Sequence, residues 1–334
     1  MLTILNDVHI GAERTAGTTK ETRLALRNSL ISRFETLLPM SGDLMILGDL
    51  FDRFDAPSRD VAKVFILLSG WLSFTPAAKL YLVAGNHDLS KSSEVYGSFD
   101  LLAELLQNDH SNVQVIKQPT MTPWGYVIPH LPNQDTFNAA LEAVPECPYL
   151  FLHCNYDNFF ASQSDQSLNI SKEQVAASKA QCVILGHEHQ QKMLKGVVIP
   201  GNQIASSVSD WLGSSDEKNY VVIKDDLTMA DLKLACRKDD EYIEQDWKQL
   251  EPVDKAFVRV VGEATAEEAA MVVTAIAKYR EKSKSLVITN AVKIASATDG
   301  MEKATLEGVQ AYDVWTALSK CLSSDDLEIL RSIQ

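Results

Sequence analysis

Five short stretches of this chain place histidine, aspartate or asparagine directly after a run of apolar residues. Imidazole nitrogens and carboxylate or amide oxygens are ligands for manganese, iron and zinc, so these stretches could hold metal ions. Five of the seven histidines follow such runs, and His110 and His130 do not. The stretches are ILNDVHIG (4–11), MILGDLFDRFD (45–55), YLVAGNHDLS (81–90), YLFLHCNYD (149–157) and AQCVILGHEHQQKML (180–194).

Each stretch taken alone is weak evidence for a metal site. Asp7 could cap a turn, and Asn86 and Asp88 after a glycine are also typical of an ordinary turn. A lone histidine after a strand is more often solvated or packed in the core than bound to a metal. However, the carboxyl ends of strands in βαβ units gather along one edge of a sheet. We therefore expect the five stretches to converge, and the glycines before Asp49, Asn86 and His187 allow the sharp turns and close approach that this requires.

The elements that must position these residues follow an alternating pattern. From residue 1 to about 225, short apolar runs alternate with amphipathic stretches, which predicts βαβ units and an α/β fold. Two later apolar runs, 196–200 and 219–225, are expected to close a second sheet. The expected strands are 2–5, 43–47, 79–83, 149–152 and 182–185, and the expected helices are 20–38, 58–73, 98–107 and 134–144.

Three further parts follow this first domain, which we place at 1–225. Residues 226–252 are acid-rich and poor in apolar runs, which predicts a connector. Residues 253–298 predict a small β-α-β domain. Residues 302–334 are typical of amphipathic helices, which could dock a partner or pack on their own domain. Their apolar positions recur at three to four residues, at Val309, Tyr312, Trp315, Leu318 and Leu322.

Composition excludes several classes of protein. The N-terminus has no basic segment followed by a long apolar one, so we expect no secretory signal, and the longest apolar stretch (64–74) is too short for a membrane span. Five cysteines without a CxxC pair argue against a disulfide framework or a thiolate metal site and favour a reducing cytoplasm.

The net charge of −14 disfavours nonspecific nucleic-acid binding through the overall field of the protein. The small domain differs, because residues 253–298 hold seven basic and five acidic side chains, net +2. KYREKSKS (278–285) alone has four basic residues and one acid, enough for a few phosphate contacts. The alternative is a solvated helix end whose cations favour the helix dipole.

The ordered set DxH, GDxxD, GNHD, strand-end histidine and GHxH resembles the signature of the calcineurin-like metallophosphoesterases. The resemblance covers about the first 210 residues. It implies an α/β fold of two packed β-sheets flanked by helices, here followed by a small α+β capping domain and C-terminal helices. It also implies two divalent metal ions, manganese first, with magnesium, iron or zinc also compatible.

The same resemblance implies roles for individual residues. Metal one would be held by Asp7, His9, Asp49 and His189, and metal two by Asp49 as a bridge with Asn86, His153 and His187. Such a pair of ions can clamp phosphate oxygens and activate water. His87 would donate a proton to the leaving group.

Three neighbours of these residues are candidates for supporting roles. Asp52 and Arg53 could form an outer shell around the bridging carboxylate, or a plain salt bridge. Asp88 could orient His87 or its loop, or have a purely structural role. Glu188 should point away from the two histidines beside it if the segment is extended, so we assign it no role.

Several stretches most resemble the nuclease subunit of the SbcCD complex and its meiotic-recombination relatives. They are NDVHIGA, GDLFDRFDAPS, GNHD and the segment 186–213, GHEHQQKMLKGVVIPGNQIASSVSDWLG. The resemblance implies an exonuclease or endonuclease of DNA repair or recombination. The small domain would then cap DNA, and 302–334 would dock an SMC-like, SbcC-type ATPase.

Relatives in that group also commonly form homodimers, and the short chain resembles the compact versions encoded by tailed bacteriophages. We therefore expect a cytoplasmic protein of a bacterial or phage-infected cell. One alternative is a stand-alone phosphatase or cyclic-nucleotide phosphodiesterase that does not act on DNA. Another is a scaffold subunit with an inert site, against which the intact set of ligands argues.

Overall fold

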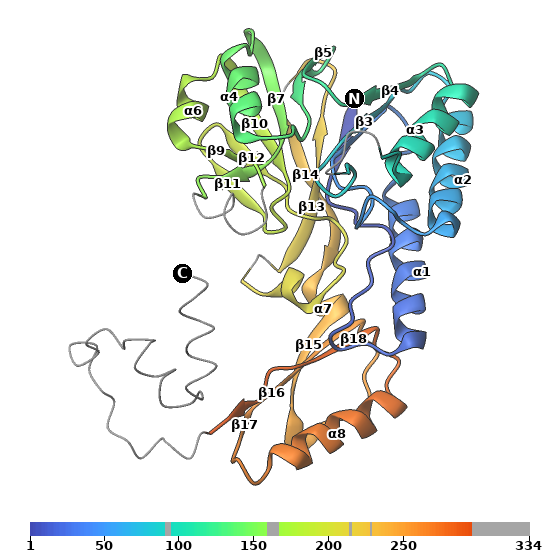
Figure 1. Ribbon diagram of the computed structural model, residues 1–334, viewed down its shortest axis with the longest axis vertical. Helices are drawn as coiled ribbons and strands as arrows, with labels where there is room; N and C mark the ends of the chain where they lie inside the picture. The colour runs from blue at the N-terminus through green and yellow to red at the C-terminus, as the bar shows by residue number, and fades with distance from the viewer. Residues whose placement is uncertain (91–94, 159–166, 214–215, 228, 296–334) are drawn as a thin grey trace, which may run out of the picture.

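The computed structural model describes residues 1–90, 95–158, 167–213, 216–227 and 229–295 (Figure 1). The expected docking segment, 302–334, lies outside the described residues.

Two six-stranded sheets form the centre of the molecule and confirm the expected two-sheet α/β fold. The first has the order β14-β13-β1-β2-β3-β4 and the second β11-β12-β10-β7-β6-β5. The first comprises β14 (Met229–Arg237), β13 (Glu217–Ile223), β1 (Leu2–Leu5), β2 (Asp43–Leu47), β3 (Leu80–Val83) and β4 (Val113–Ile116). The second comprises β11 (Lys192–Leu194), β12 (Val197–Ile199), β10 (Ala180–Gly186), β7 (Cys147–His153), β6 (Gly125–Ile128) and β5 (Thr120–Thr122).

Alternation along the strands explains how the two sheets pack. In β2, Met45 and Leu47 join a cluster with Phe151 and Ile184 of the second sheet, while Ile46 joins the cluster with the helices. Successive side chains of a strand point to opposite faces, so one face of each sheet is buried against the other sheet.

All four expected helices are present, together with one more on the second sheet. Helices α1 (Lys20–Leu37), α2 (Ser58–Phe74) and α3 (Ser98–Asp109) lie on the outer side of the first sheet, and α4 (Gln134–Glu142) and α6 (Lys172–Ala177) lie beside the second (Figure 1). Phe34 of α1 and Leu68 of α2 are fully buried in the cluster that contains Ile46. Among the described residues, no helix combines the length and apolarity needed to cross a bilayer.

Two expectations about the chain after residue 196 need correction. The run 219–225 belongs to the first sheet rather than the second, because β13 pairs antiparallel with β1. The segment 226–252, expected as a connector, contains β14, α7 (Lys238–Glu241), β15 (Tyr242–Asp246) and the 3-10 turn η2 (Trp247–Gln249). Both of its strands lie at sheet edges. Edge strands tolerate charged side chains because these remain in solvent, so an acid-rich composition does not exclude strands here.

The small C-terminal part is a parallel three-stranded sheet, β15-β16-β18, with β16 at Phe257–Val261 and β18 at Val287–Asn290. Helix α8 (Ala269–Lys282) packs on Val258 and Val260, while Phe257 and Val287 belong to the same cluster as Phe34. The remaining short elements are β8 (Asn155–Tyr156), β9 (Asn169–Ile170), η1 (Val208–Trp211), β17 (Glu263–Ala264) and β19 (Lys293–Ile294). The small sheet therefore shares a core with the two-sheet part.

Truncation of Phe257 tests this shared core. Phe257 is fully buried, so Phe257→Ala is expected to lower the free energy of unfolding by about 3–5 kcal/mol. Phe74→Ala is the matched control, because Phe74 is 91% exposed and its loss should change stability by less than about 0.5 kcal/mol. Urea unfolding measures both values, and equal stability of the two variants would contradict the shared core.

Candidate metal centre

The two sheets bring the five stretches to one rim. Strands β1, β2 and β3 are mutually parallel, and so are β7 and β10, and the polar residues stand at the carboxyl ends of all five. Contacts cross from one sheet to the other at this rim: His153 Nδ1 lies 3.0 Å from the carbonyl oxygen of Leu47, and the amide of His187 donates to Asp7 Oδ2 at 2.9 Å. The residues that converge are Asp7, His9, Asp49, Asn86, His87, His153, His187 and His189.

The first half of the centre contains Asp7, His9 and His189. One ligand atom from each lies within 4.8 Å of the others, and the Nε2 atoms of His9 and His189 are only 3.0 Å apart. The Nε2 atom of an imidazole that binds a metal offers a lone pair, so two such atoms this close together, next to a buried carboxylate, suit a cation.

The second half contains Asp49, Asn86, His153 and His187. Asn86 Oδ1 lies 3.0 Å from both His153 Nε2 and His187 Nδ1, and Asp49 Oδ2 lies 3.3 Å from His153 Nε2. The same carboxylate oxygen lies 3.9 Å from His9 Nε2. Asp49 thus stands between the two halves, in the position of a bridge. A donor set of nitrogen and oxygen without thiolate fits two divalent ions of the manganese, iron or zinc type.

The backbone at this rim is held in an unusual conformation. Asp7, His9, Asp49 and His187 have positive φ angles of 52°, 50°, 50° and 87°, which side chains other than glycine rarely adopt. Hydrogen bonds between the loops compensate, including His9 N to Asp49 O at 3.0 Å. Such strain persists only where the surrounding structure enforces it, and it clusters at functional sites.

Two glycines allow the loops to approach this closely. A Cβ at Gly48, whose φ is +83°, would lie 2.1 Å from His153 Nδ1. A Cβ at Gly85 would lie 2.2 Å from Asp49 Oδ1. The expected need for glycine before Asp49 and Asn86 is therefore confirmed.

Burial and mutual contact set the protonation states. Burial lowers the pKa of His9 to about 4, so its ring is neutral and can offer a lone pair. Burial opposes charge on Asp49 and His153, but their attraction outweighs it: the pKa of Asp49 falls well below its usual range, and that of His153 rises to about 9. Without a metal, these two groups form an ion pair.

Hydrogen bonds select which ring nitrogen faces the centre. A carbonyl oxygen only accepts, so His153 Nδ1 donates to Leu47 and its Nε2 is turned to Asp49. His189 Nδ1 lies 2.9 Å from Asp210 Oδ1, which leaves Nε2 facing His9. Such outer partners orient metal-binding histidines. Asp210 lies within the segment 186–213, but the sequence assigned it no role.

His87 lies next to the carboxylate of Asp49, on the solvent-accessible side of the centre. Its Nδ1 donates to the carbonyl oxygen of Asp52 at 2.6 Å, and its Nε2 lies 4.0 Å from Asp49 Oδ2. The His87 side chain is 42% exposed, so Nε2 can reach both the centre and a substrate.

The three supporting candidates have different environments. Asp52 lies next to the centre, with Oδ1 3.5 Å from His9 Nδ1. Arg53 shows the salt-bridge alternative, since its guanidinium is 60% exposed and pairs with Asp55 at 2.5 Å. Asp88 is fully buried and accepts from the amides of Gly85 at 3.0 Å and Phe51 at 3.1 Å, so it ties two loops together.

His130 also lies at this rim, which corrects the expectation that it does not follow a strand. It comes two residues after β6, whose Ile128 pairs with Leu152 just before His153, and its amide donates to Ala84 O at 2.9 Å. The strand was missed because it is only four residues long and begins with glycine. Burial and the positive His153 lower the pKa of His130 to about 4.

A pH dependence of stability follows for the metal-free protein. The unfolded state binds a proton at His130 with a pKa near 6.5 and the folded state only near 4, so this contribution to stability is complete above about pH 6.5 and is lost as the pH falls towards 4. His130→Gln should therefore reduce the loss of stability over this window by about 3 kcal/mol. Urea unfolding in EDTA across this range measures it, and parallel curves for wild type and variant would contradict it.

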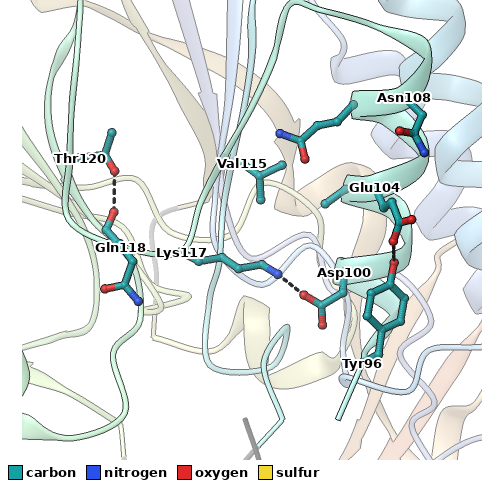
Figure 2. A pocket seen from close by; sticks show the side chains of 10 residues that line it. Tyr96, Asp100, Glu104, Asn108, Val115, Lys117, Gln118 and Thr120 are labelled. Atoms are coloured by element: carbon teal, nitrogen blue, oxygen red, sulfur yellow. Dashed lines mark hydrogen bonds and ion pairs between the residues drawn. The ribbon is translucent and has the colours of Figure 1, made fainter. Parts of the chain in front are cut away.

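A polar pocket of about 620 Å³ lies elsewhere, between α3 and the β4–β5 segment, and shares no residue with the metal centre (Figure 2). Its charged groups are already paired, Lys117 with Asp100 and Tyr96 with Glu104. Among its lining residues, this pocket therefore offers no unpaired charged side chain.

Comparison with known proteins agrees with this centre. Residues 1–191 match the calcineurin-like phosphoesterase family. The chain belongs to this family. The match and the clustered histidines and carboxylates support a phosphoester hydrolase that uses divalent metals. No curated protein matches the chain. Among solved structures, the chain is similar to the Pseudomonas putida nuclease MPE, with 17% identity over 66% of this chain and 84% of that chain and a TM-score of 0.26. That level of similarity carries no argument about substrate.

Proposed function

We propose that this calcineurin-like phosphoesterase is a two-metal phosphodiesterase that cleaves DNA, as the nuclease subunit of an SbcCD-like repair or recombination complex. The ester chemistry is supported by the family and the rim of ligands. The choice of DNA is supported mainly by one observation: three lysines at the end of α8 and just beyond it form no ion pair with the described residues.

In this proposal the rim residues are either metal ligands or, in the case of His87, a proton donor. Asp7, His9, Asp49 and His189 hold one ion, and Asp49, Asn86, His153 and His187 hold the other. The bound ions, manganese first, would neutralise phosphate oxygens and lower the pKa of water enough for attack on phosphorus near neutral pH. His87, oriented through Nδ1 by the Asp52 carbonyl, passes a proton from Nε2 to the leaving oxygen.

The lysines that support DNA as substrate lie at the C-terminal end of α8 and just beyond it. Lys278, Lys282 and Lys284 are exposed, and none forms an ion pair within the described part of the chain. In a protein of net charge −14, free cations grouped on one small domain favour phosphate contacts. Gly17, in the loop that follows His9, accepts a hydrogen bond from Ile288 at 2.8 Å and ties this domain to the metal-centre side of the molecule.

Partners remain part of the proposal. The resemblance to the SbcCD nuclease subunit implies that 302–334 docks an SMC-like ATPase in the cytoplasm of a bacterial or phage-infected cell, and the amphipathic spacing of this segment is compatible with docking. Recovery of the ATPase with full-length protein, compared with a chain ending at residue 301, tests this. Equal recovery of the ATPase with both chains would contradict a docking role for 302–334. The proposed homodimer is tested separately, by the molar mass of the full-length protein from light scattering.

The substrate is tested by comparing manganese-dependent cleavage of linear duplex and single-stranded DNA with hydrolysis of bis(4-nitrophenyl) phosphate and a cyclic nucleotide. Charge reversal of Lys278, Lys282 and Lys284 should weaken DNA binding and reduce the slope of log affinity against log salt by about 2–3, while hydrolysis of the small diester is unchanged.

The matched control reverses the charge of three other exposed lysines, so that the net charge changes by the same amount. These lysines are Lys79, Lys195 and Lys224. Cleavage of small phosphoesters without cleavage of DNA would favour the stand-alone phosphatase or cyclic-nucleotide phosphodiesterase. Equal losses in both triple variants would leave only a general charge effect and remove the role of α8.

A further inference from the structure

His9 and His189 approach each other directly through their Nε2 atoms. A second chain of contacts, which passes through Arg14, connects their Nδ1 atoms. On one side, Arg14 Nη2 lies 3.4 Å from Asp52 Oδ1. The same carboxylate oxygen lies 3.5 Å from His9 Nδ1, which is buried and makes no hydrogen bond within the described chain. Asp52 therefore places a negative charge between the guanidinium and the ring of His9.

On the other side, the path runs through a serine and a buried aspartate. Arg14 Nη2 donates to Ser206 Oγ at 2.6 Å, and Ser206 Oγ lies 3.3 Å from Asp210 Oδ2. Asp210 Oδ1 then accepts from His189 Nδ1 at 2.9 Å. Because the Nε2 atoms of His9 and His189 are 3.0 Å apart, these contacts close a loop that we call the Arg14 ring. Its members are Arg14, Asp52, His9, His189, Asp210 and Ser206.

The ring is built from well-anchored parts. Asp210 is 4% exposed and also accepts from the amides of Ser206 at 2.8 Å and Ser207 at 2.9 Å. The pKa of Asp210 is lowered: burial opposes its charge, but the hydrogen bond from His189 outweighs that effect. Arg14 itself is 31% exposed, and its Nη2 atom contacts both acceptors, Ser206 Oγ at 2.6 Å and Asp52 Oδ1 at 3.4 Å.

The second half-site is oriented differently. His153 is held by the main-chain carbonyl of Leu47, and Asn86 Oδ1 lies against both His153 and His187. None of these contacts passes through Arg14. The two half-sites should therefore respond differently to a change at this arginine.

We infer that Arg14 is a positioning residue for the ion held between His9 and His189. By holding Asp52 and Ser206 in place, it fixes the orientation of both imidazoles so that both Nε2 atoms face the same ion. The inference rests on the two-metal part of the proposed function, but not on DNA as the substrate. Loss of such outer contacts typically weakens metal binding by about 10–100-fold.

The test is manganese binding to the full-length protein, by calorimetry and by electron paramagnetic resonance of the bound ions. Wild type should bind two ions and show the coupled spectrum of a bridged pair. Arg14→Ala should keep one ion at wild-type affinity, weaken the other by about 10–100-fold, and show the spectrum of a single uncoupled ion at limiting metal.

Two further variants keep the result interpretable. Arg53→Ala is the matched control, since Arg53 pairs with Asp55 and should leave both ions unchanged. Ser206→Ala removes one arm of the Arg14 ring with less risk to folding and should show the same one-ion weakening to a smaller degree. Thermal unfolding of each metal-free variant reports whether the fold is intact.

Three outcomes would overturn the inference. They are two ions at wild-type affinity in both Arg14→Ala and Ser206→Ala, equal weakening of both ions, and a wild-type protein that binds no manganese. A wild type that binds two ions but cleaves no DNA would contradict the proposed substrate and leave the role of Arg14 standing.

Discussion

Asp49→Asn is expected to reduce kcat/KM for phosphodiester hydrolysis by about 10³-fold or more, because a bridging charge worth several kcal/mol is removed. Asp49 Oδ2 lies 3.3 Å from His153 Nε2 and 3.9 Å from His9 Nε2, between the two half-sites. No other carboxylate of the described chain appears in two of the clusters that could hold metal ions. Its replacement should therefore weaken both ions, in contrast to Arg14→Ala.

Asparagine is chosen because it preserves shape. The amide of His87 donates to Asp49 Oδ1 at 2.9 Å, and an asparagine oxygen can accept the same bond, so the loop should remain in place. Manganese titration and initial rates measure the effect. Asp109→Asn, at an exposed position at the end of α3, is the control and should behave as wild type. An Asp49→Asn variant that kept two ions and a rate within tenfold of wild type would disprove the bridging role.

His87→Ala is expected to lower kcat by about 10²–10⁴-fold on DNA, the usual range for loss of a general acid. The His87 Nδ1 donates to the Asp52 carbonyl and Nε2 faces Asp49, so the ring is oriented to deliver its Nε2 proton. An alkoxide leaving group, as in DNA, needs that proton, whereas 4-nitrophenolate is a stable anion. The loss on bis(4-nitrophenyl) phosphate should therefore be much smaller.

The comparison of the two substrates gives this prediction its specificity. Manganese binding should be unchanged in His87→Ala if the residue donates a proton and is not a ligand. His110→Ala is the matched control, because His110 contacts Ser69 at 2.8 Å and belongs to none of the metal clusters of the described chain. Equal losses on both substrates together with loss of an ion would identify His87 as a ligand instead.

Local patterns predicted much of the fold. Helices α1 and α2 appear within one residue of their expected ends, because helical periodicity and caps are properties of neighbouring residues. The sequence did not predict that β13 belongs to the first sheet, nor that 226–252 contains strands. Strand pairing depends on partners distant in sequence, and the solvent-facing edge of a sheet accepts the charged residues that otherwise indicate a connector.

The supporting residues of the centre could not be predicted for a related reason. Arg14 meets Ser206 across 192 positions of chain and Asp210 meets His189 across 21, and the spacing of these residues does not predict either contact. His130 was set apart from the other strand-end histidines because the strand before it is short.

The order and types of the strand-end residues were enough to identify the set of possible metal donors, because ligand chemistry belongs to single side chains and each one follows its strand within a few residues. Tertiary structure alone decided that these donors meet, which nitrogen of each ring is turned inward, and that Arg53 faces Asp55 rather than the centre. Those features depend on hydrogen bonds such as that from His153 to Leu47, 106 residues away, and no local pattern encodes such a contact.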